Sequence, residues 1–127
     1  MFWLNKLPMN LNNYTIKSQE AIQQAVQLAA GNGQQAIEPA HILKGILSTD
    51  ENVTPFILKK LNVNGSSFGK LVDSIVNSYP KVSGGQPHLS SAANTALAKA
   101  SNYLKDYNDE YVSIEHLLLG LLHSGDS

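Results

Sequence analysis

Two stretches of this chain carry the same pattern of residues. When His41 is placed on His116, an offset of 75 positions (116 minus 41), the stretches align without a gap. Identical residues coincide at further positions: Ala21 with Ala96, Ala25 with Ala100, Leu43 with Leu118, Gly45 with Gly120, and Leu47 with Leu122. Because a single register aligns so many small and apolar residues, we interpret the chain as a tandem duplication of one structural unit.

The apolar residues of each copy recur with the period of a helix. In the first copy, for example, Ile22, Ala25, Val26 and Ala29 lie at positions i, i+3, i+4 and i+7. Helix starts are predicted at Thr15, Pro39, Thr54-Pro55, Gly65-Ser66-Ser67, Ser90 or Ser91, and Ser113, with stops at Gly31-Asn32-Gly33 and Pro80. Since no segment alternates apolar and polar residues convincingly, the predicted fold is all-α, a pseudo-twofold repeat of a four-helix unit.

The duplication also predicts the domain organisation. We expect residues 1–8 to be an extension outside the fold and residues 9–127 to form one domain. Repeat one would span about 9–79, a Gly- and Pro-containing linker 80–89, and a truncated repeat two 90–127. Counterparts of the third and fourth helices would begin near position 128. We therefore expect uncovered apolar faces on the fifth and sixth helices, and self-association or a domain-swapped pair.

Composition narrows the function classes. The formal net charge is −1 and the nine Lys and Arg residues are scattered, so nucleic acid is not an expected partner. The chain has no cysteine, no unbroken apolar stretch typical of a secretory signal, and no run long enough to span a membrane. We expect a soluble, cytoplasmic protein that neither binds a membrane nor uses thiol chemistry.

No motif predicts catalysis. The segment Gly65-Ser66-Ser67-Phe68-Gly69-Lys70-Leu71 superficially suggests a phosphate loop, but its glycines are too close together and Leu71 replaces the required Ser or Thr. His116 and His123 are two helical turns apart, too far to share one ion, and His41 recurs as His116 through the duplication. The sequence therefore predicts no enzyme activity, no metal site and no cofactor in this domain.

The paired motifs resemble a known family. Thr15-Ile16-Lys17 before an Ala-rich helix, followed by Ile37-Glu38-Pro39-Ala40-His41-Ile42-Leu43, is similar to the first repeat of a Clp amino-terminal domain. The segment Tyr111-Val112-Ser113-Ile114-Glu115-His116-Leu117-Leu118-Leu119 is similar to the second. Within this family the Glu-Pro-x-His form of the first motif resembles the ClpB-type disaggregase chaperones.

The resemblance implies a role in handling unfolded proteins. Such domains are tethered to a hexameric AAA+ ATPase that uses ATP and Mg²⁺ in other modules and works with a DnaK-type chaperone. They capture unfolded or aggregated polypeptide in a shallow apolar groove and pass it to the ring. By position, the implied substrate-binding residues are polar Thr15, Asp109 and Glu115, with Leu97, Tyr103 and His116 lining the groove.

Two other functions stay open. One is an adaptor- or phosphoarginine-binding domain of a ClpC- or ClpA-type unfoldase that serves a protease. That use relies on a Glu before the motif His in both repeats, but here Glu115 precedes His116 while Ala40 precedes His41. The other is a stand-alone helical protein without an ATPase partner. Asp109, Glu110 and Glu115 form an acidic cluster. Interaction with the positive end of a helix could account for Glu115, whereas Asp109 precedes the helix and fits better in a polar rim that binds peptide or docks on the parent ATPase.

Overall fold

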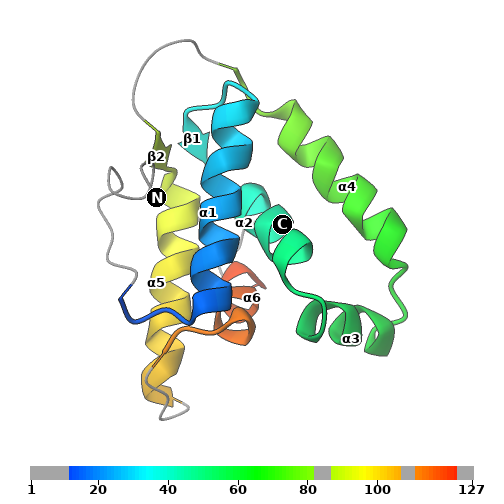
Figure 1. Ribbon diagram of the computed structural model, residues 1–127, viewed down its shortest axis with the longest axis vertical. Helices are drawn as coiled ribbons and strands as arrows, with labels where there is room; N and C mark the ends of the chain where they lie inside the picture. Colours follow the sequence, from blue (N-terminus) through cyan, green and yellow to red (C-terminus); the bar gives the residue numbers. More distant parts are fainter. Residues whose placement is uncertain (1–11, 82–86, 107–110, 123–127) are drawn as a thin grey trace.

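The computed structural model describes residues 12–81, 87–106 and 111–122, and the structural statements below concern these residues. They form helices joined by short connections, with two very short strands (Figure 1). The elements are α1 Ile16–Gly31, β1 Ala36–Ile37, α2 Pro39–Thr49, α3 Val53–Lys60, α4 Gly65–Ser78, β2 His88–Leu89, α5 Ser91–Asp106 and α6 Ile114–Leu122. The mostly helical fold predicted from the sequence is confirmed.

The first helices of the two repeats are capped in the same way. The Thr15 hydroxyl accepts a hydrogen bond from the Ser18 amide at 3.2 Å, and the Ser90 hydroxyl accepts one from the Ala93 amide at 3.0 Å. These bonds satisfy amides that have no partner inside the helix. The 75-residue offset relates both pairs, and Ser90 rather than Ser91 is the cap of α5.

The two repeats are joined by reciprocal backbone pairing, which the sequence did not predict. β1 pairs in parallel with β2, with Ile37 opposite Leu89, and an isolated parallel bridge joins Tyr14 to Val112. At the 75-residue offset Tyr14 corresponds to Leu89, and Ile37 to Val112. In both contacts, the segment before the first helix of one repeat pairs with the segment before the second helix of the other repeat.

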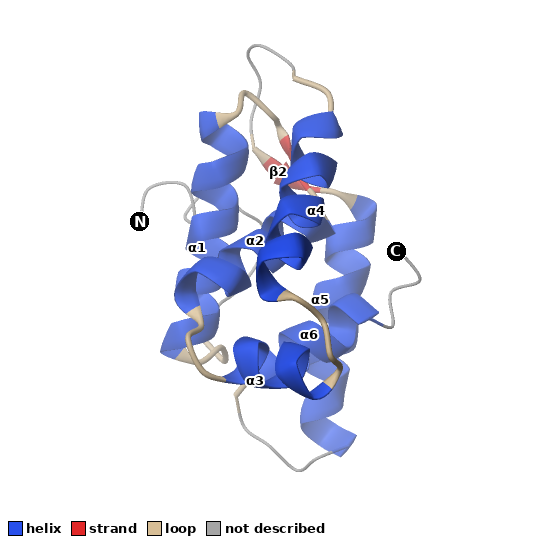
Figure 2. Ribbon diagram, turned by 90° about the vertical axis from the view of Figure 1, so that its right-hand side faces the viewer, coloured by secondary structure: helices blue, strands red, loops and turns tan. Residues whose placement is uncertain are grey.

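Within each repeat the two helices meet at a glycine. α1 packs against α2, and α5 packs against α6 (Figures 1 and 2). A Cβ atom added to Gly45 would lie 2.2 Å from the Ala21 carbonyl oxygen, and one added to Gly120 would lie 2.3 Å from the Ala96 carbonyl oxygen. Glycine is needed at both sites because the helix backbones approach this closely.

The core lies between these helix pairs and includes residues from both repeats. Its largest fully buried apolar side chains are those of Ile22, Ile37, Ile42, Ile46 and Leu117. α4 packs on α2 away from this core, whereas α3 buries only Thr54 (Figures 1 and 2). None of the helices in the described ranges is long and apolar enough to cross a membrane.

The start of α3 differs from the predicted Thr54-Pro55 cap. The helix begins at Val53, and the Asp50 carboxylate accepts hydrogen bonds from the amides of Asn52, Val53 and Thr54 and from the Thr54 hydroxyl. Burial raises the pKa of Asp50, but these hydrogen bonds outweigh burial and leave it below its ordinary value. Asp50 is therefore the group that holds α3 to the end of α2.

Replacing Asp50 with alanine is expected to lower the free energy of unfolding by about 2 kcal/mol, because a buried set of donors loses its acceptor. Urea denaturation followed by circular dichroism measures the change. Asp73→Ala, which removes a half-exposed carboxylate on α4, is the control and should change stability by less than about 1 kcal/mol. Equal effects of the two substitutions would contradict the assigned role of Asp50.

Candidate functional site

The predicted polar residues Thr15 and Glu115 lie at the starts of two adjacent helices. The Thr15 amide donates a hydrogen bond of 2.9 Å to the Val112 carbonyl, which brings the beginning of α1 to the segment that leads into α6. Thr15 is half-buried because its hydroxyl caps α1, while Glu115 is exposed in the first turn of α6. Glu115 is therefore accessible to a ligand, whereas Thr15 has a structural role as the helix cap.

Two of the predicted groove residues lie inside the protein. Leu97 is 6% exposed and His116 is 5% exposed. The His116 Nδ1 atom accepts a hydrogen bond of 2.9 Å from the Ser113 amide, so this ring fixes the start of α6. Tyr103 is half-buried on α5, and Asp109 lies outside the described residues. At most the edges of Leu97 and His116 are available at the surface.

Two exposed apolar residues lie at this end of the molecule, and neither is among the predicted site residues. Ile16, the first residue of α1, is 73% exposed, and Tyr111, beside the Tyr14–Val112 bridge, is 52% exposed. Ile16 lies outside the apolar stripe of its helix, and this position indicates in the sequence that its side chain does not face the core. We call Ile16, Tyr111 and Glu115 the α1–α6 surface.

His41 occupies the position equivalent to His116 and is fully buried. Its Nδ1 atom accepts a hydrogen bond from the Glu38 amide at 2.9 Å, and its Nε2 atom lies 2.7 Å from the Gln34 side-chain oxygen. Because an amide can only donate, the ring proton is on Nε2 and the ring is neutral. Burial lowers the pKa of His41 to about 4. In the part of the chain that the structure describes, no group of three His, Asp or Glu residues could hold a metal ion.

A separate hollow of about 550 Å³ lies between α2, α3 and α4. Apolar, basic, acidic and small residues line it, and none of them was predicted as a site residue: Leu47, Pro55, Leu58, Val63, Lys44, Lys59, Asp50, Ser48, Gly65 and Gly69. This hollow is formed entirely by the first repeat, whereas the α1–α6 surface combines the two repeats.

Comparisons with known proteins agree with the sequence motifs and the fold. ClpB chaperones of Bacteroides thetaiotaomicron and Porphyromonas gingivalis are 57% and 47% identical to this chain over 114 residues. Those matches cover 90% of this chain but only 13% of each relative, so the chain spans a small part of the length of these chaperones.

Solved structures show the same fold at lower sequence identity. The Hsp104 N-terminal domain of Candida albicans has a TM-score of 0.81 at 23% identity, covering 89% of this chain and 75% of that one. The N-terminal domain of the ClpV1 ATPase of Escherichia coli has a TM-score of 0.80 at 19% identity, covering 87% and 68%. The model of the Clp repeat (R) N-terminal domain matches residues 13–127. With this match, the reciprocal pairing of its two repeats and the resemblance of its motifs, the chain belongs to the Clp repeat N-terminal domain family.

Proposed function

We propose that this domain is the non-catalytic, substrate-engaging N-terminal domain of a cytoplasmic, ATP-dependent ClpB-type disaggregase. The observation that carries the proposal is the 57% identity to a ClpB chaperone over 90% of the chain. ATP and Mg²⁺ would act in the ATPase modules of the parent hexamer, and a DnaK-type chaperone would cooperate with that hexamer. Neither nucleic acid nor a membrane is a proposed partner.

In this proposal the α1–α6 surface captures unfolded or aggregated polypeptide. Exposed Ile16 and Tyr111 offer apolar contact area, and Glu115 offers a charge beside them. Thr15, Leu97, Tyr103, Asp109 and His116 would support or border the same shallow groove. Each site would bind weakly, and six copies on a ring would supply avidity while still releasing the polypeptide to the ATPase pore.

Titration with a permanently unfolded polypeptide that carries Lys and Arg among apolar residues, followed by NMR, tests this function. We expect saturable shifts clustered at Ile16, Tyr103, Tyr111 and Glu115. Glu115→Gln should weaken binding about three- to tenfold, because it removes the charge at the edge of the surface. Asp73→Asn, which removes the same charge on α4, should leave the affinity unchanged.

Three results would contradict the proposed surface. The folded domain could show no saturable shifts, which would indicate a docking or spacer role in the parent protein. Asp73→Asn could weaken binding as much as Glu115→Gln does, which would indicate a nonspecific charge effect. Finally, saturable phosphoarginine binding that is lost in Glu115→Gln would favour the adaptor-type function over polypeptide capture.

A further inference from the structure

The hollow between α2, α3 and α4 is lined by two glycines that helix packing does not require. Gly65 and Gly69 of α4 both line it, and a Cβ atom added to either residue would meet nothing within 4 Å. Gly69 lies inside the helix and does not have a positive φ angle. A glycine inside a helix is unfavourable relative to alanine, so this position weakens α4 without a structural need.

Gly45 and Gly120 differ from Gly69 in their surroundings. Those two glycines are required because a backbone oxygen of the neighbouring helix lies where a Cβ would be. At Gly69 a Cβ would meet open space, and the residue lines the hollow. The effect of this glycine is therefore to keep the hollow open beside the apolar side chains of Leu47, Leu58 and Val63.

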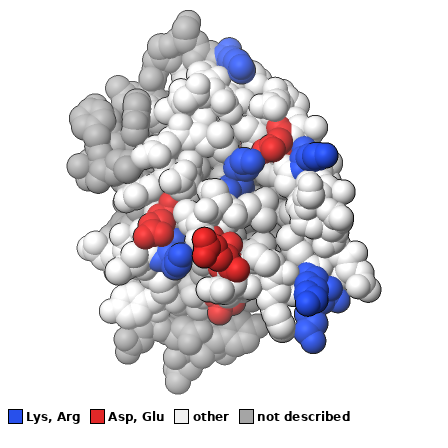
Figure 3. Space-filling model, turned by 45° about the vertical axis from the view of Figure 1, so that its right-hand side comes forward, with Lys and Arg blue, Asp and Glu red and all other residues white. Residues whose placement is uncertain are grey.

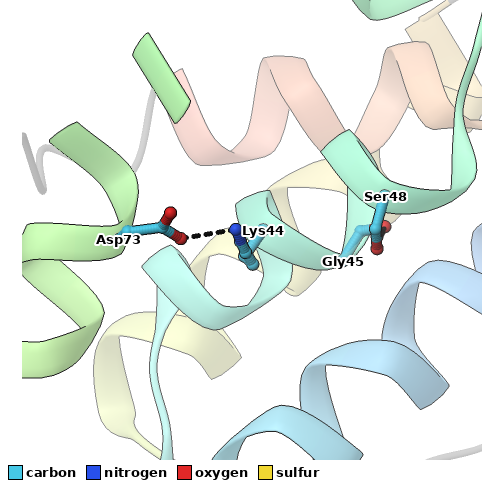
Figure 4. Close-up of polar contacts among 4 residues, drawn as sticks. All are labelled: Lys44, Gly45, Ser48 and Asp73. Atoms are coloured by element: carbon cyan, nitrogen blue, oxygen red, sulfur yellow. Dashed lines mark hydrogen bonds and ion pairs between the residues drawn. The ribbon is translucent and has the colours of Figure 1, made fainter. Parts of the chain in front are cut away.

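Lys44, Lys59 and the Asp50 carboxylate line the hollow, and Lys59 is the charge that can attract an acidic ligand. Lys44 is paired with Asp73 across the gap from α2 to α4, as Figure 4 shows. Both oxygens of Asp50 accept hydrogen bonds from the start of α3. Lys59, in contrast, has no ion-pair partner among the described residues. Figure 3 shows one group of lysine atoms at the lower right edge of this face, apart from the acidic side chains, whereas other lysines are scattered and several lie beside acidic side chains.

Exposed apolar residues are concentrated around the same site. Among the described residues, five of the eight exposed large apolar side chains belong to α3, α4 or their connection: Phe56, Ile57, Leu61, Val63 and Leu71. Phe56, Lys59 and Lys60 lie together at the surface, and Lys59 also lines the hollow. The Lys60 ammonium lies 5.4 Å from the centre of the Phe56 ring. Exposed apolar area with polar residues at its rim marks a surface that binds another molecule.

We propose that the α2–α3–α4 hollow is a second docking site, which binds a segment of a partner protein that carries both carboxylates and large apolar side chains. An apolar side chain of that segment enters the space beside Gly69, and an adjacent carboxylate pairs with Lys59. The site shares no lining residue with the α1–α6 surface. The domain can therefore hold this partner and an unfolded polypeptide at the same time.

Fluorescence anisotropy with two labelled peptides tests the proposal. One peptide alternates Glu and Asp with Leu and Phe, and the other has Lys at every acidic position. The acidic peptide should bind saturably and at least about tenfold more tightly than the basic one, because like charges repel at Lys59. Gly69→Leu, which fills the hollow, and Lys59→Glu should each weaken acidic-peptide binding at least about tenfold.

The controls separate loss of the site from loss of the fold. Gly69→Leu should not lower the melting temperature, since leucine is a better helix former than glycine and the space is open. Lys81→Glu makes the same charge change beyond the other end of α4 and should leave binding intact. Binding that survives both Gly69→Leu and Lys59→Glu, or equal affinity for the two peptides, would overturn the proposal. Concentration-dependent dimerisation lost in Gly69→Leu would overturn it too, by assigning the hollow to a second copy of the chain.

Discussion

Replacing Gly45 with alanine is expected to lower the free energy of unfolding by about 3 kcal/mol or more. The added methyl group would lie 2.2 Å from the Ala21 carbonyl oxygen and 3.2 Å from the Ala25 amide nitrogen. Both atoms belong to the backbone of α1, so a side-chain rotation cannot relieve the overlap. α1 and α2 must move apart, and buried contacts of Ile22, Ile42 and their neighbours are lost.

Urea denaturation followed by circular dichroism measures this effect, and the chain contains a matched control. Gly69→Ala makes the same substitution in open space and should stabilise the protein by about 0.5–1 kcal/mol. Gly120→Ala should be as harmful as Gly45→Ala, because its methyl group would meet the Ala96 carbonyl oxygen at 2.3 Å. Unchanged stability of Gly45→Ala would show that the two helices are not packed this closely.

The sequence analysis did not predict the close approach at Gly45 and Gly120, although the repeat carries a signal for it. A single helical glycine has several explanations. Here Gly45 aligns with Gly120, and the alanines that they meet on the neighbouring helices align as well, which indicates a packing requirement that both copies share. The helix caps at Thr15 and Ser90 were predictable for the same reason. Duplication thus made the helices and their pairing the most predictable part of the fold.

The features that the sequence did not predict are short or depend on tertiary contacts. β1 and β2 have two residues each, too few to show the alternation by which strands are recognised. At α3, Thr54-Pro55 has the form of a cap followed by proline, but the Asp50 carboxylate reaches the amides of three later residues and starts the helix earlier. Both candidates are buried, and only the tertiary structure shows that Asp50 is the acceptor while the Thr54 hydroxyl donates to it.

The candidate site was the least predictable part because burial decides it. Leu97 and His116 are on the apolar stripes of their helices, and a stripe that faces the core looks the same in sequence as one that lines a groove. The structure buries both side chains, while exposed Ile16 is the residue that leaves its stripe. The glycine that opens the α2–α3–α4 hollow was equally ambiguous, since the sequence does not show which helical glycines lack a neighbour.

Acidification should destabilise this domain between about pH 6.5 and pH 4 because of His41. The pKa of this buried ring is lowered to about 4, whereas in the unfolded chain it returns to about 6.5. Between these values the unfolded chain binds a proton that the folded protein does not bind. Stability therefore falls as the pH falls through 6.5, by at most about 1.4 kcal/mol per pH unit, and this loss levels off below about pH 4.

Burial is the cause of the lowered pKa of His41, and the contacts of the ring act in the same direction. Protonation of Nδ1 would place an N–H group against the Glu38 amide, which can only donate, inside a site that also contains the Gln34 side chain and the Tyr79 ring at 5.2 Å. The lowered pKa of Asp50 affects stability in a different pH range. That carboxylate contributes stability above its ordinary pKa near 3.8 and loses the contribution as the pH falls below it.

Urea denaturation at intervals from pH 7.5 to pH 4.5 tests the assignment to His41. His41→Gln should be less stable than the parent protein at pH 7.5, because the hydrogen bond between the Glu38 amide and the ring is lost. Its stability should nevertheless fall less steeply towards pH 4.5, so that the difference between the two proteins narrows on acidification. Parallel curves would show that another group is responsible. His88→Gln is the matched control: it removes a histidine that is exposed on β2, and its curve should keep the steep slope of the parent protein.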